Sequence, residues 1–320
     1  MTDPILVTGA AGFAGSHLLD LLSVEGNPVV AWRRSNEMPS AIGGASAPPQ
    51  VIWQSVDLLD RDAVYQAVAE LRPSAVYHCA GAAHVGRSWK STSATFAVNV
   101  RGTHHLFEGL RRAGVRARVV LPSSAMVYAT AEAPLTEDHQ LVPRSPYALS
   151  KLAQELVGRH AMNNDLHVSI ARAFNHLGPR QDPNFAASGF ARRIADIEAG
   201  RSEAEIAVGN LNARRDLTDV RDTIRAYRLI LERGEGGRAY NVCSGRAVSI
   251  GELLEMLLAR ARVPIRVRVD TMRYRPNDIP YLVGDHTRIS TELGWEPQIP
   301  LDRTLDDLLK FWRIRSTTTA

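Results

Sequence analysis

The sequence predicts an α/β fold, in which a doubly wound parallel sheet carries a smaller, discontinuous α/β lobe. Short apolar runs alternate with helical segments as far as about residue 171, as expected of parallel strands joined by crossover helices. A glycine-rich turn links the first of these strands to the first helix. After Phe174 the alternation becomes irregular, which predicts a second lobe rather than a longer sheet.

The elements of the sheet can be placed from the apolar pattern of the sequence. The chain has 320 residues and is 45% hydrophobic, which is sufficient for one large core and a smaller lobe. The low-complexity stretch from Ala41 to Pro49 is predicted to be a loop. We expect strands near residues 4–8, 28–32, 51–55, 75–79, 118–122 and 167–172, and helices near 14–23, 61–71, 94–113 and 146–163.

The first strand runs into a Gly-x-x-Gly-x-x-Gly turn formed by Gly9, Gly12 and Gly15, with Phe13 and Ala14 before the last glycine. Gly9 would allow the tight turn, Gly12 the close approach of a pyrophosphate, and Gly15 close contact between helix and strand. The helix N-terminus would then face the anion. The alternative is a turn that only connects a strand to a helix. We expect a dinucleotide-binding site here.

The cofactor's ribose is expected at the end of the second strand. An acidic residue usually stands there in NAD-selective sites, whereas this chain has Arg33 and Arg34. Two guanidinium groups suit a 2'-phosphate, so we expect NADP(H), with NAD as the other possibility. The alternative is a solvated basic loop. Asp57 and Leu58 could line the adenine, and Ala80 lies in a small-residue turn predicted under the dinucleotide.

These expectations divide the chain into two discontinuous parts. Residues 1–172 and 215–246 should form the NADP-binding Rossmann domain, and residues 173–214 and 247–320 the substrate-binding lobe. In doubly wound folds the ligand lies beyond the carboxyl ends of the strands. We therefore expect the substrate between the sheet and the lobe.

Tyr147 and Lys151 are four residues apart, so a helix would stack them on one face. Ser145 is a natural N-cap and Pro146 a natural first residue of that helix. The nearby ammonium and the helix dipole should lower the pKa of the phenol towards the working pH. The alternative is a surface helix with unrelated Tyr and Lys. Ser124, at the end of the fifth strand, could donate to the same carbonyl oxygen as Tyr147, or it could simply cap a turn.

The composition excludes several classes of protein. The net charge of +4 comes from scattered arginines, which argues against a nucleic-acid-binding protein. No apolar run approaches the roughly 20 residues that span a bilayer, and the N-terminus leaves no room for a signal peptide, so we expect no membrane association and a cytoplasmic location. Cys79 and Cys243 occur in apolar contexts and are expected to be buried thiols. We expect no metal site.

Taken together, these motifs resemble the extended short-chain dehydrogenases/reductases that modify nucleotide sugars, with Asn99 as a further cofactor-binding match. The segments 172–179, 208–222 and 273–278 are most similar to those of GDP-6-deoxy-4-keto-mannose reductases and less similar to those of GDP-mannose 4,6-dehydratases. The resemblance implies NADPH-dependent reduction of the C4 ketone of a GDP-4-keto-6-deoxyhexose to a GDP-6-deoxyhexose such as GDP-rhamnose. It also implies a homodimer or higher homo-oligomer, paired through the helices near 94–113 and 146–163.

The same resemblance implies a set of substrate-binding residues. Arg215 and Arg275 would bind the diphosphate, although Arg214, Arg215 and Asp216 could instead form a surface ion cluster. His84 could touch the sugar or cap a loop. The full set is His84, Ser124, Asn175, Arg193, Val208, Asn210, Arg215, Arg275 and Asp278.

Three other functions share part of this residue pattern: a dehydratase, a 4-epimerase and a regulator without catalytic activity. The dehydratases of this family carry a carboxylate soon after the catalytic Ser or Thr, and this chain has Ala125 and Met126 there, which cannot transfer a proton. A nucleotide-sugar 4-epimerase would use the same Ser, Tyr and Lys but would retain NAD, against which Arg33 and Arg34 argue. A dinucleotide-sensing regulator is the non-enzymatic alternative, and such proteins often lack the Tyr or Lys that is present here.

Overall fold

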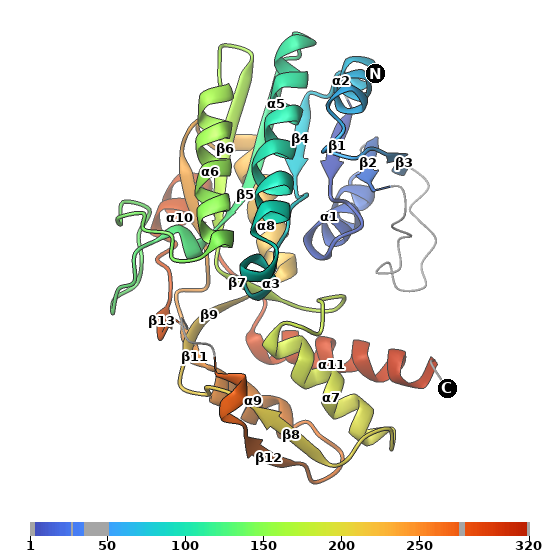
Figure 1. Cartoon of the computed structure of the whole chain (residues 1–320), viewed down its shortest axis with the longest axis vertical. Helices are drawn as coiled ribbons and strands as arrows, with labels where there is room; N and C mark the ends of the chain where they lie inside the picture. The colour runs from blue at the N-terminus through green and yellow to red at the C-terminus, as the bar shows by residue number, and fades with distance from the viewer. Residues whose placement is uncertain (1–3, 27, 35–50, 275–278, 319–320) are drawn as a thin grey trace.

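The computed structural model describes residues 4–26, 28–34, 51–274 and 279–318. In this part of the chain, seven parallel strands form the main sheet in the order β10-β6-β5-β4-β1-β2-β3 (Figure 1). The strand order reverses between β1 and β4, which creates a topological switch point of the kind that binds dinucleotides. The strands are β1 (Ile5–Thr8), β2 (Val29–Arg33), β3 (Val51–Ser55), β4 (Ala75–His78), β5 (Ala117–Ser124), β6 (Leu166–Ala173) and β10 (Ala239–Val242).

Helices cover both faces of this sheet, as the alternation of the sequence predicts. Successive strand side chains point to opposite faces, so Leu6 packs into the core beneath one helical layer and Val7 into the core beneath the other. The first layer contains α2 (Arg61–Leu71), α5 (Thr103–Arg112) and α6 (Pro146–Ala161), and the second contains α1 (Phe13–Val24), α8 (Val220–Arg233) and α10 (Thr287–Leu293). The predicted doubly wound α/β class is confirmed.

The helix expected at 94–113 is broken into three pieces. It consists of α4 (Thr92–Phe96), a π-helical turn η1 (Ala97–Gly102) and α5, and it is preceded by an unexpected short helix, α3 (Val85–Lys90). A Cβ at Gly102 would lie 3.1 Å from the Cβ of Leu58, so the backbone passes very close to the end of the third strand here. The π-turn widens the helix at this point and carries Asn99, and such turns are frequent at functional sites. The predicted loop from Ala41 to Pro49 lies outside the described residues.

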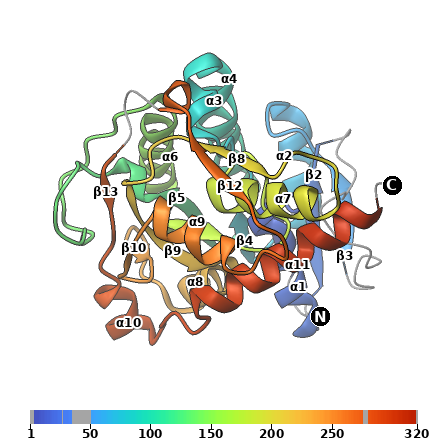
Figure 2. The ribbon, with the colours of Figure 1, turned by 90° about the horizontal axis from the view of Figure 1, so that it is seen from below.

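The lobe lies beyond the carboxyl ends of the sheet strands (Figure 1). Figure 2 shows α7 and α11 side by side in this lobe, and the two helices pack against each other with α9. The lobe helices are α7 (Ala186–Glu198), α9 (Ile250–Leu258) and α11 (Leu301–Thr318). Its strands are β7 (Asn175–Leu177), β8 (Glu205–Val208), β9 (Arg214–Asp219), β11 (Ala247–Ser249), β12 (Arg266–Val269) and β13 (Tyr281–Leu282). A short helical turn, η3 (Thr271–Arg273), follows β12, and another, η2 (Ala125–Val127), follows β5 of the main sheet. The exact domain boundaries stay a prediction.

Candidate active site

The turn after β1 requires glycine at two of its positions. Gly9 has a φ of +64°, and a Cβ there would lie 2.6 Å from the backbone of Ala80. A Cβ at Gly15 would lie 2.3 Å from the carbonyl oxygen of Gly9. Gly12 is the N-cap of α1, it offers no capping side chain, and the first turn of the helix contains no acidic residue. The amides at this end of α1 therefore fit a phosphate group.

Phe13 connects this turn to the lobe. Its ring stacks on His176 of β7, with the ring centroids 5.6 Å apart, and Phe13 and Ala14 are both partly buried. The glycine turn therefore lies between the main sheet and β7 of the lobe. The predicted ligand would lie at this turn.

The predicted ribose and adenine residues lie at the neighbouring strand ends. Arg33 ends β2, with its guanidinium 5.7 Å from the ring centroid of Trp53, and Arg34 follows it as an exposed side chain. Asp57 is also exposed, whereas Leu58 is a buried core residue. Their contact with adenine stays a prediction.

Asn99 is completely buried, and its side chain forms hydrogen bonds with other residues of the protein. Its Oδ1 accepts a hydrogen bond from the Ala82 amide at 2.7 Å, and its Nδ2 donates to the Ser150 hydroxyl at 2.9 Å and to the Ala82 carbonyl at 3.3 Å. These bonds join the turn after β4, which contains Ala80, to the second turn of α6. Any contribution of Asn99 to cofactor binding would pass through these two segments.

The start of α6 agrees with the sequence analysis. Ser145 is the N-cap, its hydroxyl accepts a hydrogen bond from the Ala148 amide at 3.1 Å, and Pro146 is the first helical residue. Tyr147 lies in the first turn, and its amide donates to the Ser88 hydroxyl of α3 at 3.1 Å. The side chain of Tyr147 is thereby positioned by its helix and by α3.

Ser124 and Tyr147 are brought together, but the pKa of the phenol differs from the expectation. Burial raises the pKa of Tyr147 above its usual value, and only the hydrogen bond with Ser124 opposes this shift. The expectation that Lys151 and the helix dipole lower this pKa is wrong here, because desolvation disfavours the phenolate more strongly. A phenol that stays protonated at neutral pH can donate a proton. The Ser124 hydroxyl also accepts a hydrogen bond from the Met126 amide at 3.2 Å, so this serine caps η2 as well.

Lys151 is buried on the same face of α6. Its ammonium donates to the Pro122 carbonyl oxygen at 2.6 Å and to Oε1 of Gln154. Burial lowers the pKa of Lys151 to about 8, and the negative charge of Glu155 partly opposes this. The lysine is therefore mostly charged at neutral pH and is oriented by two acceptors.

A buried ion pair joins β6 to α6, next to β5. Arg172 of β6 donates to Glu155 of α6 through Nε at 3.0 Å and through Nη2 at 2.8 Å, and the Ser123 hydroxyl also donates to Glu155. Nη1 of Arg172 contacts the Tyr128 hydroxyl at 3.1 Å, which in turn donates to Asn241 at 2.6 Å. The strand end that carries Ser124 is thus joined to α6 and to β10.

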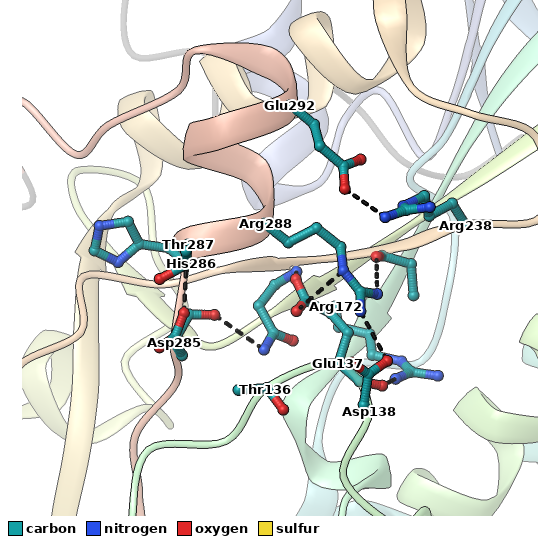
Figure 3. Close-up of polar contacts among 12 residues, drawn as sticks. Thr136, Glu137, Asp138, Arg172, Arg238, Asp285, His286, Thr287, Arg288 and Glu292 are labelled. Carbon is teal, nitrogen blue, oxygen red and sulfur yellow. Dashed lines mark hydrogen bonds and ion pairs between the residues drawn. The ribbon is translucent and has the colours of Figure 1, made fainter.

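The same network extends to the segment that precedes α6. Figure 3 shows Arg288 of α10 between Glu137 and Asp138, with Arg172 close by. The backbone N–H of Asn241 donates to Glu137 Oε1 at 2.7 Å, and Arg288 donates to Asp138 Oδ1 at 2.7 Å. These contacts hold the segment between η2 and α6 against the edge of the sheet.

His84, another residue of the predicted substrate set, lies in the segment after β4. It is the N-cap of α3 but makes no capping hydrogen bond through its side chain. Instead its ring stacks on Phe185 with the centroids 4.7 Å apart, and Nε2 lies 3.3 Å from Asp182. His84 therefore contacts the loop that leads into α7.

The other predicted substrate residues are distributed over the lobe. Asn175 is exposed on β7, Val208 is buried at the end of β8, and Asn210 is partly buried just beyond it. Arg193 is exposed on α7, where its Nε donates to the Glu205 carbonyl at 3.2 Å. Arg275 and Asp278 lie outside the described residues.

Arg215 and Asp216 do not form a surface ion cluster. Asp216 is completely buried and accepts hydrogen bonds from the Ser244 amide and hydroxyl, from the Gly245 amide and from the Gly284 amide. Arg215 points to the opposite face of β9, where its Nη1 donates to the Ile279 carbonyl at 2.6 Å. The alternation of side chains along a strand separates the two charges.

A cavity of about 720 Å³ lies between the glycine turn and the lobe, within the usual size range of small-molecule sites. Its arginines outnumber its carboxylates, which favours an anionic ligand, but Ser124, Tyr147 and Lys151 do not line it. Its lining comprises Phe13, Arg180, Gln181, Asp182, Pro183, Arg192, Arg193, Asp196, Arg201, Ser202, Phe311, Trp312, Arg315 and Ser316.

The described part of the chain was expected to contain no membrane span and no metal site. Its helices include none that is long and apolar enough to cross a membrane, and its His, Cys, Asp and Glu side chains form no group of three or more that could hold a metal ion. Cys79 and Cys243 are free thiols, and Cys243 is buried.

Several residues that contact Lys151 or lie behind Ser124 were not predicted from the sequence. Gln154 and Glu155 follow Lys151 at the i+3 and i+4 positions, so the helical spacing could have identified them. Thr103 of α5 contacts Gln154, His78 of β4 contacts Thr103, and Arg172 of β6 contacts Glu155. These three residues come from other elements and carry no local signal. Their roles depend on which strands and helices are neighbours.

Comparison with known proteins identifies the family of this chain. Residues 6–308 match the family model described as GDP-mannose 4,6 dehydratase. The GDP-6-deoxy-D-mannose reductase of Pseudomonas aeruginosa is 34% identical, over 98% of this chain and 99% of that protein. The UDP-glucose 4-epimerase of Bacillus subtilis is 32% identical, over 98% of this chain and 97% of that protein.

Among solved structures, RMD from Pseudomonas aeruginosa complexed with NADPH superposes with a TM-score of 0.84 at 31% identity, covering 98% of this chain and all of that one. The family resemblance inferred from the motifs is therefore confirmed. The chain belongs to the GDP-mannose 4,6-dehydratase family, a group of extended short-chain dehydrogenases/reductases that modify nucleotide sugars.

Proposed function

We propose that this protein reduces the C4 ketone of a GDP-4-keto-6-deoxyhexose with NADPH, giving a GDP-6-deoxyhexose such as GDP-rhamnose. The observation that carries the proposal is the meeting of Ser124 and Tyr147 at the carboxyl end of β5, beside a buried and oriented Lys151. The GDP-6-deoxy-D-mannose reductase among its relatives supports the choice of substrate.

In this proposal, bound NADPH supplies a hydride to C4 of the sugar. The Ser124 and Tyr147 hydroxyls hydrogen-bond to the C4 oxygen and polarise the carbonyl. Tyr147 then gives its proton to that oxygen, which its raised pKa permits. The ammonium of Lys151 would bind the ribose next to the nicotinamide through the donor that Pro122 and Gln154 leave open.

The residues after Ser124 favour reduction over dehydration. Ala125 is completely buried and Met126 is partly buried in η2, and neither can serve as the acid or base that loss of water requires. A ketone reductase needs no such pair.

NADP(H) is the proposed cofactor because Arg33 and Arg34 lie at the end of β2, next to the glycine turn. A similar solved structure binds NADPH. If the chain is instead a 4-epimerase, the expected cofactor is NAD. The 32% identity to a UDP-glucose 4-epimerase supports this as the second candidate function. A dinucleotide-sensing regulator would bind NADPH without turnover.

We also propose that the protein is a cytoplasmic homodimer or higher homo-oligomer, which binds neither membranes nor nucleic acids. Leu149 and Leu156 on α6 are 48% and 59% exposed, and an adjoining groove of about 490 Å³ runs between α6 and the α4–α5 segment. A second copy would cover this apolar surface. Leu156→Glu should then give monomers by light scattering, and an unchanged mass would contradict the proposed contact.

The reaction is tested by incubating the protein with NADPH and GDP-4-keto-6-deoxymannose. We expect loss of NADPH absorbance in proportion to the GDP-rhamnose formed, which NMR can identify. Interconversion of C4 epimers without net oxidation of NADPH would favour the epimerase. Binding of NADPH with no turnover of any nucleotide hexulose would favour the regulator.

A further inference from the structure

A buried chain of hydrogen bonds runs from the glycine turn to Lys151. The Thr8 hydroxyl lies 2.8 Å from Nδ1 of His78, whose Nε2 lies 2.8 Å from the Thr103 hydroxyl. Nε2 of Gln154 is 2.8 Å from the same hydroxyl, and its Oε1 accepts from Lys151. All five side chains are at least nine-tenths buried. The chain joins β1, β4, α5 and α6 beneath the expected position of the cofactor.

In this chain of hydrogen bonds, the position of each shared hydrogen can be assigned from the groups on either side of it. The Thr103 hydroxyl donates its single hydrogen to the Asn99 carbonyl oxygen at 2.7 Å, because a carbonyl can only accept. The Thr103 oxygen must therefore accept from both of its other neighbours. Nε2 of His78 carries a hydrogen, and Gln154 turns its NH₂ group towards Thr103.

The remaining bonds follow from the same argument. Burial lowers the pKa of His78 to about 3, so the ring is neutral and Nδ1 accepts a hydrogen bond. Thr8 must then donate to Nδ1, and its oxygen accepts from the Ala80 amide at 3.2 Å. This leaves one tautomer of His78 that satisfies all of its neighbours.

The orientation of the Gln154 amide is the consequence that matters for Lys151. If the amide were flipped, its NH₂ group would face the ammonium and its oxygen would face a hydroxyl whose hydrogen is already used. Resting on the proposed function, we propose that Gln154 is a positioning residue for Lys151, and that Thr8, His78 and Thr103 hold its amide in the orientation that accepts from the ammonium.

Two of the three ammonium donors of Lys151 are thus occupied, by the Pro122 carbonyl and by Gln154. The third is left for the cofactor's ribose. The titratable groups that act on Lys151 are Glu155 on its own helix, Cys79 at the end of β4 and His78. None of them is changed in the Gln154 and Thr103 variants below.

The test compares Gln154→Met with Gln154→Glu in the pH dependence of kcat. Loss of the acceptor disfavours the charged lysine, so Gln154→Met should reduce kcat about tenfold or more and move the alkaline limb to lower pH. A carboxylate favours the charged lysine, so Gln154→Glu should move this limb to higher pH. A merely structural role would not move the limb in opposite directions, and shifts in the same direction or no shift would overturn the proposal.

A matched pair of threonine variants tests the rest of the chain. Thr103→Val removes the acceptor for His78 and Gln154 and should move the alkaline limb in the same direction as Gln154→Met. Thr223→Val removes a similar buried bond, from a helical hydroxyl to the Asp219 carbonyl at 3.2 Å on α8, and should leave the limb in place. Equal shifts in both variants would contradict the proposal.

A measurement without cofactor or substrate separates this inference from the proposed function. Nitrogen NMR of histidine-labelled protein, with His78 identified by its loss in His78→Asn, should show the Nε2–H tautomer and no protonation at neutral pH. The Nδ1–H tautomer, or a charged ring, would overturn the chain of hydrogen bonds. If no GDP-4-keto-6-deoxyhexose is reduced by the unmodified protein, the proposed function fails, and this measurement still decides the inference.

Discussion

The buried pair of Arg172 and Glu155 allows a quantitative prediction of stability. Arg172 is 3% exposed and Glu155 is 1% exposed, and two hydrogen bonds of 3.0 and 2.8 Å join them. In Arg172→Met, Glu155 would keep only the Ser123 hydroxyl as a donor. Removing one partner of a buried pair leaves an unpaired buried charge and typically costs about 3–5 kcal/mol. We expect a loss of this size in the free energy of unfolding.

The double variant Arg172→Met/Glu155→Met supplies the decisive comparison. Because neither charge remains, its loss of stability should be clearly smaller than the sum of the two single losses. Urea unfolding followed by circular dichroism measures all three variants. Arg303→Met is the control, since Arg303 is 68% exposed and pairs with Asp307 at 3.1 Å on the surface of α11, where a pair contributes at most about 1 kcal/mol.

Two results would refute this reasoning. One is a loss below about 1 kcal/mol in Arg172→Met, which would equal the effect of a surface pair. The other is additivity of the two single losses, which would mean that the charges do not compensate each other.

The remaining predictions concern the proposed reaction. Tyr147→Phe should lower kcat by about 10²- to 10⁴-fold with little change in NADPH affinity; an active variant would exclude Tyr147 as the proton donor. In the unmodified protein, kcat should fall as the pH rises through about 8, because the pKa of Lys151 is lowered to about 8 and the charged form predominates below it; a rise in kcat over this range would contradict the role of Lys151. Gly15→Ala should abolish NADPH binding measured by fluorescence, since the added Cβ would lie 2.3 Å from the carbonyl oxygen of Gly9. Unchanged affinity would refute the predicted phosphate site at the glycine turn. Replacing Arg33 and Arg34 with Ser should weaken NADPH about tenfold or more relative to NADH, and equal losses for both cofactors would exclude a 2'-phosphate contact.

Local sequence signals predicted the sheet and the start of α6 well. The strand at 51–55 and the helix at 61–71 have the expected bounds, because the period of apolar residues reflects which face of an element is buried. Ser145 and Pro146 begin their helix as expected. Signals of this kind act within a few residues of each other.

The errors arose where distant segments meet. The helix expected at 94–113 is interrupted by a π-turn, where Gly102 lies close to Leu58. The pKa of Tyr147 is raised rather than lowered because burial, which the sequence does not reveal, outweighs the hydrogen bond with Ser124. The alternative of a surface ion cluster at Arg214–Asp216 could be decided only by the structure, in which Asp216 is buried among four donors from segments 28 to 68 residues further along the chain.

The sequence alone therefore determined the fold class, the glycine turn and the Tyr147–Lys151 face of α6, since each depends on the periodicity or backbone freedom of adjacent residues. Only the tertiary structure decided which groups surround Lys151 and Ser124. Gln154 receives its orientation through Thr103 and His78, and Glu155 is paired with Arg172 from β6. The physical reason is that burial and hydrogen-bond geometry depend on which strands and helices become neighbours, a property of the folded chain rather than of any short segment.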